Sequence, residues 1–573
     1  RGDDAPRDLT TTLSVRAEVG YGGGDFSIAN GNAYFVASDG RLYKQPLSAG
    51  IHRVITPAFG HAASPTPSPS GRHIAYVHSA EGVDRLALVD AEGQTWPQIL
   101  AEGADFYMQP CWHPKGRLLA WIEWDHPQMP WDGTRLVLAT TGYRGDGTPY
   151  IRSQRTVAGG VDESISQPCF SPDGRSLVYA SDRAGWSQLW CRDLDADTEL
   201  RLTEECCDIA TPAWIQGLRA FGFAPDGTLY FVRSEQGGRR AYALGPDGGA
   251  VEPVESLAQY DHVEQITPAP RGNHLACIAS SPAVPARIVS GRANRARVHV
   301  RSGSESLSPD QLSQPQAVSW SGAEGCTVYG LYYPPTSEQF VGTGKPPLVV
   351  NVHGGPTSSV ERGFEARAQY FATRGWTFLD LNYRGSTGHG RAYMEALRGN
   401  WGAADVDDAL SAARYLCDAD LADPDRMVLC GGSAGGYTVL RTLTAYPGSF
   451  RAGLCLYGIS NLFSLAADTH KFEAHYLDSL LGPLPQSAPL YRERSPLFAA
   501  DNIRDPIALF QGSEDRVVPP AQAEEIVANL RRRGVPHAYH LYEGEGHGWR
   551  RSETIERFYR DVDSFLKEHV LFA

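Results

Sequence analysis

The chain has 573 residues, of which 42% are hydrophobic, and its formal net charge at pH 7 is −14. This length exceeds what one ordinary core supports, so we expect a globular protein of two or three domains. The scattered acidic residues argue against a nucleic-acid partner, and no apolar run approaches the roughly 18 residues that a membrane span requires. We therefore predict a soluble protein without nucleic-acid or membrane partners.

The chain begins RGDDAPRDL, without an initiator Met, so we expect a trimmed N-terminus that leaves a targeting signal undecided. Its ten cysteines form no C-x-x-C pair, and Cys277, Cys430 and Cys455 lie in apolar, strand-like runs. This usage favours buried, reduced thiols and a cytoplasmic protein. Adjacent Cys206 and Cys207 have no His or Cys at zinc-finger spacing, so we expect no metal site.

From about residue 10 to residue 300, one unit recurs: a turn that contains glycine, followed by a strand with alternating apolar residues. Examples are SPSGRHIAYVHS, SPDGRSLVYASD and APDGTLYFVRS. The turn glycines are spaced 40 to 58 residues apart, a period typical of four-stranded propeller blades. They are Gly31, Gly71, Gly116, Gly174, Gly227 and Gly272.

Six recurrences of one unit favour a β-propeller over unrelated hairpins in a sandwich. We predict that residues 1–314 form this propeller and that it gates access of substrate. Six units are visible and the N-terminus looks cut, so we expect seven blades in the intact protein, with the first blade truncated here.

After about residue 315, strand-like runs alternate with helix-like segments, the pattern of a mostly parallel sheet covered by helices. The expected strands are 346–355, 376–385, 426–432, 452–458, 506–515 and 537–548. The expected helices are 361–375, 403–416, a segment after Ser433, 521–534 and 552–570. We predict one C-terminal α/β domain over residues 315–573.

Residues 431–435, GGSAG, match G-x-S-x-G between an expected strand and an expected helix, where a nucleophile elbow requires it. Side chains at Gly431 and Gly435 would collide with the neighbouring strand and helix. The helix N-terminus would direct its amides at developing negative charge. Ser433 is therefore the candidate nucleophile, although a plain glycine turn could carry the same pattern.

A serine hydroxyl needs a base and an orienting carboxylate, and both occur downstream. Asp515 follows one expected strand and His547 follows the next, so Ser433, Asp515 and His547 have the chain order of an α/β-hydrolase. His540 is the rival base, but it lies inside an alternating strand. Glu514 is the rival acid.

The transition state also needs donors for the oxyanion. The amide of Ala434, directly after the nucleophile, is one candidate. The segment HGGP (353–356) follows a buried strand, as the H-G-G-G motif of lipases does, and supplies Gly355 as the second donor, with Gly354 as the alternative.

Several motifs, in this order, resemble those of the prolyl oligopeptidase family of serine peptidases, particularly its acylaminoacyl-peptidase-like and dipeptidyl- or aminopeptidase-like bacterial branch. They are YGGG, WDHPQMPWDGT, NVHGGP, LNYRGSTGHG, GGSAGGY, GSEDRVVP and GEGHGW. The resemblance implies a propeller that caps the active site and admits short peptides, the triad Ser433, Asp515 and His547, oxyanion donors Gly355 and Ala434, and no cofactor.

Dipeptidyl peptidases of this family hold the substrate's free amine with a Glu pair on a propeller segment. Here Glu204 and Glu205 are the candidates, since two carboxylates can bind an ammonium, although solvated hairpin charges are the alternative. Those members also place Asn two residues after the catalytic Asp, where this chain has Val517, which argues against that sub-type. Arg516 is a candidate for contacting a substrate carbonyl or carboxylate.

We therefore predict a serine peptidase for short peptides, an oligopeptidase or exopeptidase of acylaminoacyl- or aminopeptidase-like type, acting through an acyl-enzyme on Ser433. An esterase or amidase for small molecules is the alternative, but it would not need so large a lid. A propeller interaction module joined to an inactive hydrolase is disfavoured by the complete set of catalytic residues. A homo-oligomer stays open.

Overall fold

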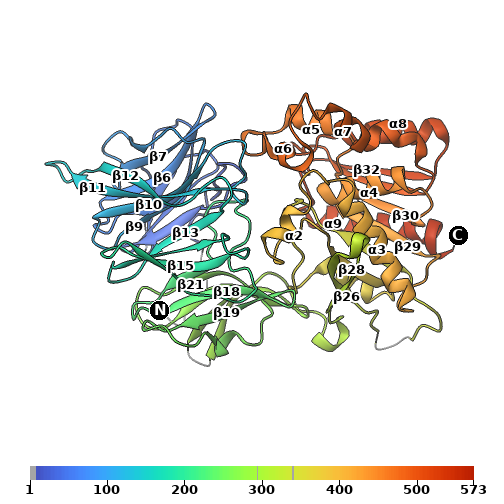
Figure 1. Cartoon of the computed structure of the whole chain (residues 1–573), viewed down its shortest axis with the longest axis horizontal. Helices are drawn as coiled ribbons and strands as arrows, with labels where there is room; N and C mark the ends of the chain where they lie inside the picture. The colour runs from blue at the N-terminus through green and yellow to red at the C-terminus, as the bar shows by residue number, and fades with distance from the viewer. Residues whose placement is uncertain (1–7, 49, 293–294, 338–340, 573) are drawn as a thin grey trace.

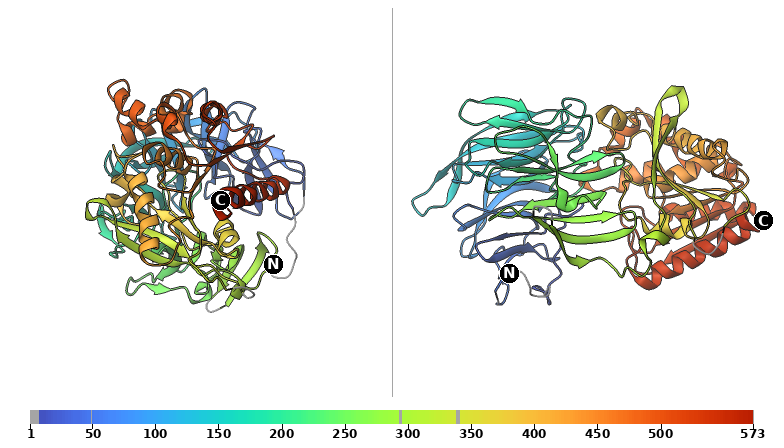
Figure 2. Two further views of the ribbon diagram at one scale, coloured as in Figure 1. Left: turned by 90° about the vertical axis from the view of Figure 1, so that its right-hand side faces the viewer. Right: turned by 90° about the horizontal axis from the view of Figure 1, so that it is seen from below.

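The computed structural model describes residues 8–572 except 49, 293–294 and 338–340. Two bodies lie side by side, one built from blue-to-green sheets and the other from yellow-to-red strands and helices (Figure 1). Seen from below, the C-terminal helix α9 (Ser552–Leu566) runs along the outer side of the second body (Figure 2).

The first body is a β-propeller of six four-stranded antiparallel blades, within the described residues. A single parallel pair between Arg239 and His262 joins the fifth and sixth blades. The blades are β1–β4 (Phe26–Ala29, Asn32–Val36, Leu42–Pro46, Arg53–Val54), β5–β8 (His61–Pro67, His73–Ala80, Val83–Asp90, Gln98–Ala101), β9–β12 (Phe106–Trp112, Leu118–Trp124, Arg135–Tyr143, Pro149–Gly159), β13–β16 (Ile165–Phe170, Ser176–Ser181, Gln188–Asp193, Thr198–Arg201), β17–β20 (Phe221–Phe223, Leu229–Glu235, Gly238–Leu244, Glu252–Pro253) and β21–β24 (His262–Pro268, Leu275–Ser281, Val284–Arg292, Arg295–Arg301).

The six predicted turn glycines each lie between the first and second strands of one blade. Their φ angles fall between +68° and +89°, a region that side chains rarely adopt, so glycine is what lets these hairpins close tightly. The predicted propeller and its six repeats are confirmed. The expected seventh blade stays a prediction.

The second body is an α/β-hydrolase domain with one mostly parallel sheet, in the order β25-β26-β28-β27-β29-β30-β31-β32. Among the described strands of this sheet, the pairs β25–β26 and β26–β28 are antiparallel, so β26 alone runs opposite to the others. The last propeller strand ends at Arg301 and β25 begins at Gln316, and a domain boundary after residue 314 stays a prediction. The strands are β25 (Gln316–Ser321), β26 (Thr327–Tyr333), β27 (Leu348–Val352), β28 (Thr377–Asn382), β29 (Met427–Gly432), β30 (Ala452–Leu456), β31 (Ile507–Gly512) and β32 (His537–Tyr542).

Helices cover both faces of this sheet. Helices α1 (Ala366–Ala372) and α9 pack on one face, whereas α3 (Ala404–Asp418), α4 (Ala434–Ala445) and α8 (Ala521–Arg533) pack on the other. The strands alternate their apolar side chains between these two cores, as expected for a sheet buried on both sides.

A helical insertion, residues 461–502, separates β30 from β31. It contains α5 (Leu462–Asp468), η4 (Lys471–Glu473), α6 (Tyr476–Leu481), α7 (Ala488–Arg494) and η5 (Pro496–Asn502). Sequence patterns assigned no element to this segment. It reaches the propeller, where the Lys471 ammonium contacts Asp84 at 3.2 Å and Phe472 packs on Phe106.

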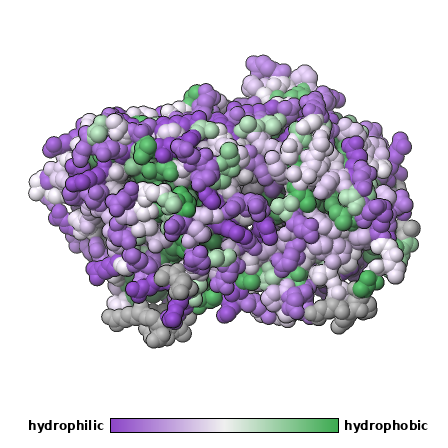
Figure 3. Space-filling view, turned by 60° about the horizontal axis from the view of Figure 1, so that its bottom comes forward, coloured by the Kyte–Doolittle hydropathy of each residue, from purple (hydrophilic) through white to green (hydrophobic). Residues whose placement is uncertain are grey.

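The two bodies are also joined by ion pairs in which the propeller supplies the acid. Asp182 pairs with Arg391 of α2 (Arg391–Glu395) at 2.6 Å, and Asp132 pairs with Arg398 at 2.9 Å. On the face in Figure 3, hydrophobic residues lie in small separate groups among hydrophilic ones. Within the described residues, no helix has the length and apolar character needed to cross a membrane.

Candidate active site

Ser433 occupies the sharp turn between β29 and α4. Its φ and ψ angles are 58° and −123°, a conformation that costs a non-glycine residue energy and that persists only where its surroundings enforce it. The turn places Ser433 at the N-terminus of α4, beside the positive end of the helix dipole. The serine hydroxyl therefore lies at the carboxyl edge of the parallel sheet, where α/β proteins bind their ligands.

The glycines around Ser433 are required by close backbone contacts. A Cβ on Gly431 would lie 2.4 Å from the carbonyl oxygen of Gly435, and one on Gly435 would lie 2.1 Å from that of Val352. Both contacts are to backbone atoms, which cannot swing aside as a side chain can. Gly431 and Gly435 of G-x-S-x-G are therefore needed because the elbow is crowded, in part against β27.

Asp515 and His547 lie in loops after β31 and β32, and they contact each other. His547 Nδ1 is 2.7 Å from Asp515 Oδ2. The other carboxylate oxygen, Oδ1, accepts hydrogen bonds from the amides of Val517 and Val518, both at 2.9 Å. The Asp515 side chain is fully buried, so these bonds fix its orientation toward His547.

The rival base and the rival acid lie elsewhere. His540 is on β32, 3.1 Å from Asp561, and its ring stacks on Phe510. Glu514 is exposed, and its amide bonds to the carbonyl of Glu545. Neither residue lines the cavity that contains Ser433 and His547. A residue not considered from the sequence, Tyr457, packs its ring 4.6 Å from the imidazole of His547.

The HGGP segment leaves β27 and faces Ser433. A Cβ on Gly354 would lie 3.4 Å from Ser433 Cβ, and Gly355 has a φ of +123°. Within the described part of the chain, the N–H groups of Gly354, Gly355 and Ala434 have no protein acceptor. These three amides line or adjoin the cavity and are free to bind an anion.

His353 holds this segment in place. Burial lowers its pKa to about 4, so the ring is neutral at pH 7. Its Nδ1 is 2.7 Å from the Gly354 carbonyl, which can only accept, and Nε2 is 2.7 Å from the Ser386 hydroxyl. The proton therefore resides on Nδ1, and Nε2 accepts from Ser386. His353 thus helps to fix the conformation of the loop that contains the candidate oxyanion donors.

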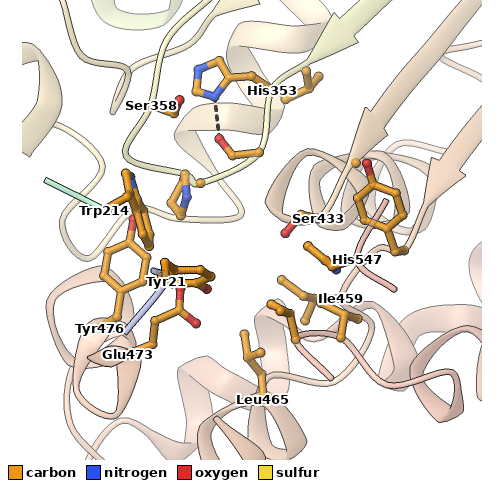
Figure 4. Close-up of a pocket in the computed structure, with 18 of the residues that line it drawn as sticks. Tyr21, Trp214, His353, Ser358, Ser433, Ile459, Leu465, Glu473, Tyr476 and His547 are labelled. Atoms are coloured by element: carbon orange, nitrogen blue, oxygen red, sulfur yellow. Dashed lines mark hydrogen bonds between the residues drawn. The ribbon is translucent and has the colours of Figure 1, made fainter. Parts of the chain in front are cut away.

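Ser433 and His547 open into a cavity of about 530 Å³ at the junction of the two domains. The volume is within the usual range for a small-ligand site. Most of its lining is apolar, including Trp401, Ile459, Leu465, Leu477 and Leu480. Figure 4 shows Ser433 and His547 on one wall and Tyr21, Trp214, Glu473 and Tyr476 on the opposite wall.

The opposite wall combines both domains. Tyr21 and Trp214 come from the propeller, whereas Glu473 and Tyr476 come from the helical insertion. Trp214 donates its indole N–H to the Thr357 carbonyl at 2.7 Å, and the Tyr476 hydroxyl accepts from the Thr357 amide at 3.0 Å. Thr357 follows HGGP directly, so the wall is tied to the loop of the oxyanion donors. Of these residues, sequence motifs flagged only Tyr21, through YGGG.

The candidate substrate-binding residues Glu204, Glu205 and Arg516 do not line this cavity. Glu205 is 3.0 Å from Arg233 in a separate pocket, and Glu204 is exposed, 3.6 Å from Arg201. Arg516 is exposed. The structure therefore corrects the expectation for the glutamate pair: arginines of the propeller already bind these carboxylates, away from Ser433.

A model of the prolyl oligopeptidase family matches residues 362–571. Dipeptidyl aminopeptidase BIII of Pseudoxanthomonas mexicana is 34% identical over 39% of this chain and 33% of its own length. Acylamino-acid-releasing enzyme of Homo sapiens is 30% identical over 39% of this chain and 31% of its own. The chain thus aligns with about a third of each of these curated relatives.

Solved structures extend the similarity to both domains. A puromycin-hydrolyzing peptidase of Mycobacterium tuberculosis is 34% identical, with a TM-score of 0.91, over 99% of this chain and 89% of that one. A mutant puromycin hydrolase complexed with PGG is 33% identical, with a TM-score of 0.90, over 98% and 88% of the two chains.

Proposed function

Because the chain belongs to the prolyl oligopeptidase family of serine peptidases, we propose that it hydrolyses short peptides through an acyl-enzyme on Ser433. One observation carries the proposal: His547 contacts buried Asp515 at 2.7 Å and shares a cavity with Ser433, which is held in a strained turn. A glycine turn without chemistry would have no reason to face an oriented imidazole.

In the proposed mechanism, His547 Nε2 takes the hydroxyl proton of Ser433 as the oxygen attacks the scissile carbonyl. The amide of Ala434 and that of Gly355, or Gly354 in its place, stabilise the oxyanion. His547 then protonates the leaving amine. Water, deprotonated by His547, attacks the ester carbonyl and releases the acid with Ser433 restored. Asp515 keeps the imidazole in the correct tautomer and stabilises its charged form.

The position of the cavity supports short substrates. It lies where the propeller meets the hydrolase domain, and its lining includes Tyr21 and Trp214 of the propeller. We expect this cover to keep folded proteins from Ser433, whereas a short peptide fits the volume.

A second candidate function, hydrolysis of small amides or esters, is favoured by the solved relatives named for puromycin hydrolysis. The same Ser433 machinery would serve it, so the two candidates differ in substrate and not in mechanism. Comparing kcat/KM for short peptides with that for puromycin and p-nitrophenyl esters separates them.

The nucleophile is tested with a fluorophosphonate probe on the full chain. We expect the native protein to be labelled and Ser433→Ala to be unlabelled. Ser358→Ala, which removes another serine hydroxyl from the cavity lining, is the matched control and should be labelled. Labelling of Ser433→Ala would contradict the assignment.

A further inference from the structure

Glu473 is the one carboxylate, among the described residues, that lines the active-site cavity. It faces the cavity from the wall opposite Ser433 and His547 (Figure 4). We propose that Glu473 binds the α-ammonium group of the substrate, so that the enzyme cleaves peptides near a free N-terminus. This inference rests on the proposed peptidase function and adds its substrate class.

Glu473 has no basic side chain close enough to neutralise it well. Its side chain is 14% exposed, and the nearest basic atom among the described residues is His470 Nε2 at 4.0 Å. It accepts hydrogen bonds from two uncharged groups, the Thr469 hydroxyl at 3.3 Å and the Tyr21 hydroxyl. A largely buried carboxylate without a cation is costly, whereas a cationic ligand would recover that cost. The side chain is therefore suited to a positively charged substrate group.

Three aromatic rings lie beside Glu473 on the same wall of the cavity (Figure 4). Tyr21 and Trp214 have ring centroids 5.5 Å apart, and Trp214 and Tyr476 are 5.6 Å apart. Burial, followed by the charge and hydrogen bond of Glu473, raises the pKa of Tyr21, so its hydroxyl stays protonated. Aromatic faces attract cations, and this attraction grows when water is excluded. A carboxylate among three aromatic rings is a setting that recognises an ammonium group.

A peptide could supply that ammonium from its N-terminus or from a lysine side chain. The rest of the cavity favours the N-terminus, because Trp401, Leu477 and Leu480 offer an apolar surface to the substrate side chain. With the side chain of the substrate on this apolar surface, Glu473 is left to bind the main-chain amine. This assignment also explains why Glu204 and Glu205 can be engaged elsewhere by arginines.

The test compares Leu-p-nitroanilide and Gly-Leu-p-nitroanilide with their N-acetyl derivatives. For Glu473→Gln we expect kcat/KM on the free-amine substrates to fall on the order of 100-fold, because a desolvated charge pair is lost. Hydrolysis of the N-acetyl substrates should be largely unchanged. Glu473→Asp, which keeps the charge, should recover part of the loss. Glu493→Gln removes an exposed carboxylate from the same insertion and should behave as wild type.

Three results for Glu473→Gln would overturn the inference. The variant could lose kcat/KM equally on free-amine and N-acetyl substrates, or lose none on either. It could also lose kcat/KM only on an added substrate, N-acetyl-Lys-p-nitroanilide, which would mean that Glu473 binds a lysine side chain. Fluorophosphonate labelling of Ser433 and hydrolysis of p-nitrophenyl acetate report on the catalytic machinery without an amine. If the wild type failed both, the proposed function itself would be wrong, and Glu473 would not be the cause.

Discussion

Arg391 of the hydrolase domain binds Asp182 of the propeller, with 2.6 Å between Nη1 and Oδ2 and about a tenth of each side chain exposed. Burial raises the pKa of Asp182 to about 6, and Arg391 opposes that rise only in part. Desolvation therefore costs this carboxylate more than the attraction returns. Loss of Arg391 alone would leave the buried Asp182 carboxylate without its cation, with the Ser164 amide still donating to it at 2.8 Å.

We expect Arg391→Met to lower the free energy of unfolding by about 3 kcal/mol, measured by urea denaturation. Asp182→Asn added to Arg391→Met should restore part of that loss, because the unpaired charge is gone. The exposed pair Arg532–Asp501 provides the comparison, and Arg532→Met should change stability little. Equal losses of unfolding free energy for the two arginine substitutions would show that the loss does not depend on burial of the ion pair.

Much of the fold could be predicted from the sequence because its signals are local. Turns that contain glycine, followed by alternating strands, mark one hairpin in each of the six blades, and apolar strands that alternate with amphipathic helices specify the parallel sheet. The insertion 461–502 was not predicted, because its helices are too short to show a clear hydrophobic period. Its conformation is set by contacts with the propeller, such as that of Phe472 with Phe106.

In the active site too, residues marked by local sequence signals could be predicted, whereas residues brought together by domain packing could not. Ser433, Asp515 and His547 follow strands whose carboxyl ends meet, so chain order suffices to predict their proximity. Tyr21, Trp214 and Glu473 meet only because two domains pack together, and no spacing in the chain encodes that meeting. The pair Glu204 and Glu205 looked suitable because sequence did not reveal Arg233 and Arg201 as their partners.

Substituting Asp515 by Asn should lower kcat on the order of 10⁴-fold, because the amide can stabilise the wrong tautomer of His547. Peptide hydrolysis measures the effect, and thermal unfolding checks that the fold survives. Glu514→Gln, a neighbouring substitution outside the cavity, should keep a near-native rate. If Asp515→Asn kept that rate instead, another carboxylate would have to orient the imidazole.

Adding one methyl group at Gly435 should disable the elbow. The new Cβ would meet the Val352 carbonyl at 2.1 Å, so the turn or β27 must move, and Ser433 would lose its position. We expect Gly435→Ala to cut the rate of fluorophosphonate labelling at least on the order of 100-fold, since a 1 Å displacement has that cost. Gly344→Ala, where the Cβ meets open space, is the control and should label at the native rate.

The pH dependence of stability should reveal an ionic cluster at the domain junction. His262, on β21, lies 2.9 Å from Glu361 of the hydrolase domain and also contacts Glu264. Burial alone would lower the pKa of His262, but the hydrogen bonds and charges of Glu264 and Glu361 outweigh it and raise the pKa to about 9.

A histidine whose pKa is higher in the folded state stabilises the protein fully below its unfolded pKa of 6.5, and this contribution is lost as pH rises through 9. The shift corresponds to about 3 kcal/mol. We therefore expect the stability difference between wild type and His262→Gln to shrink by about 3 kcal/mol between pH 6 and pH 9.5, measured by urea denaturation. His299→Gln, at an exposed position of the same blade, should show no such trend. A constant difference for His262→Gln would mean that the imidazole is not charged in the folded protein, because only proton binding makes the interaction with Glu361 depend on pH.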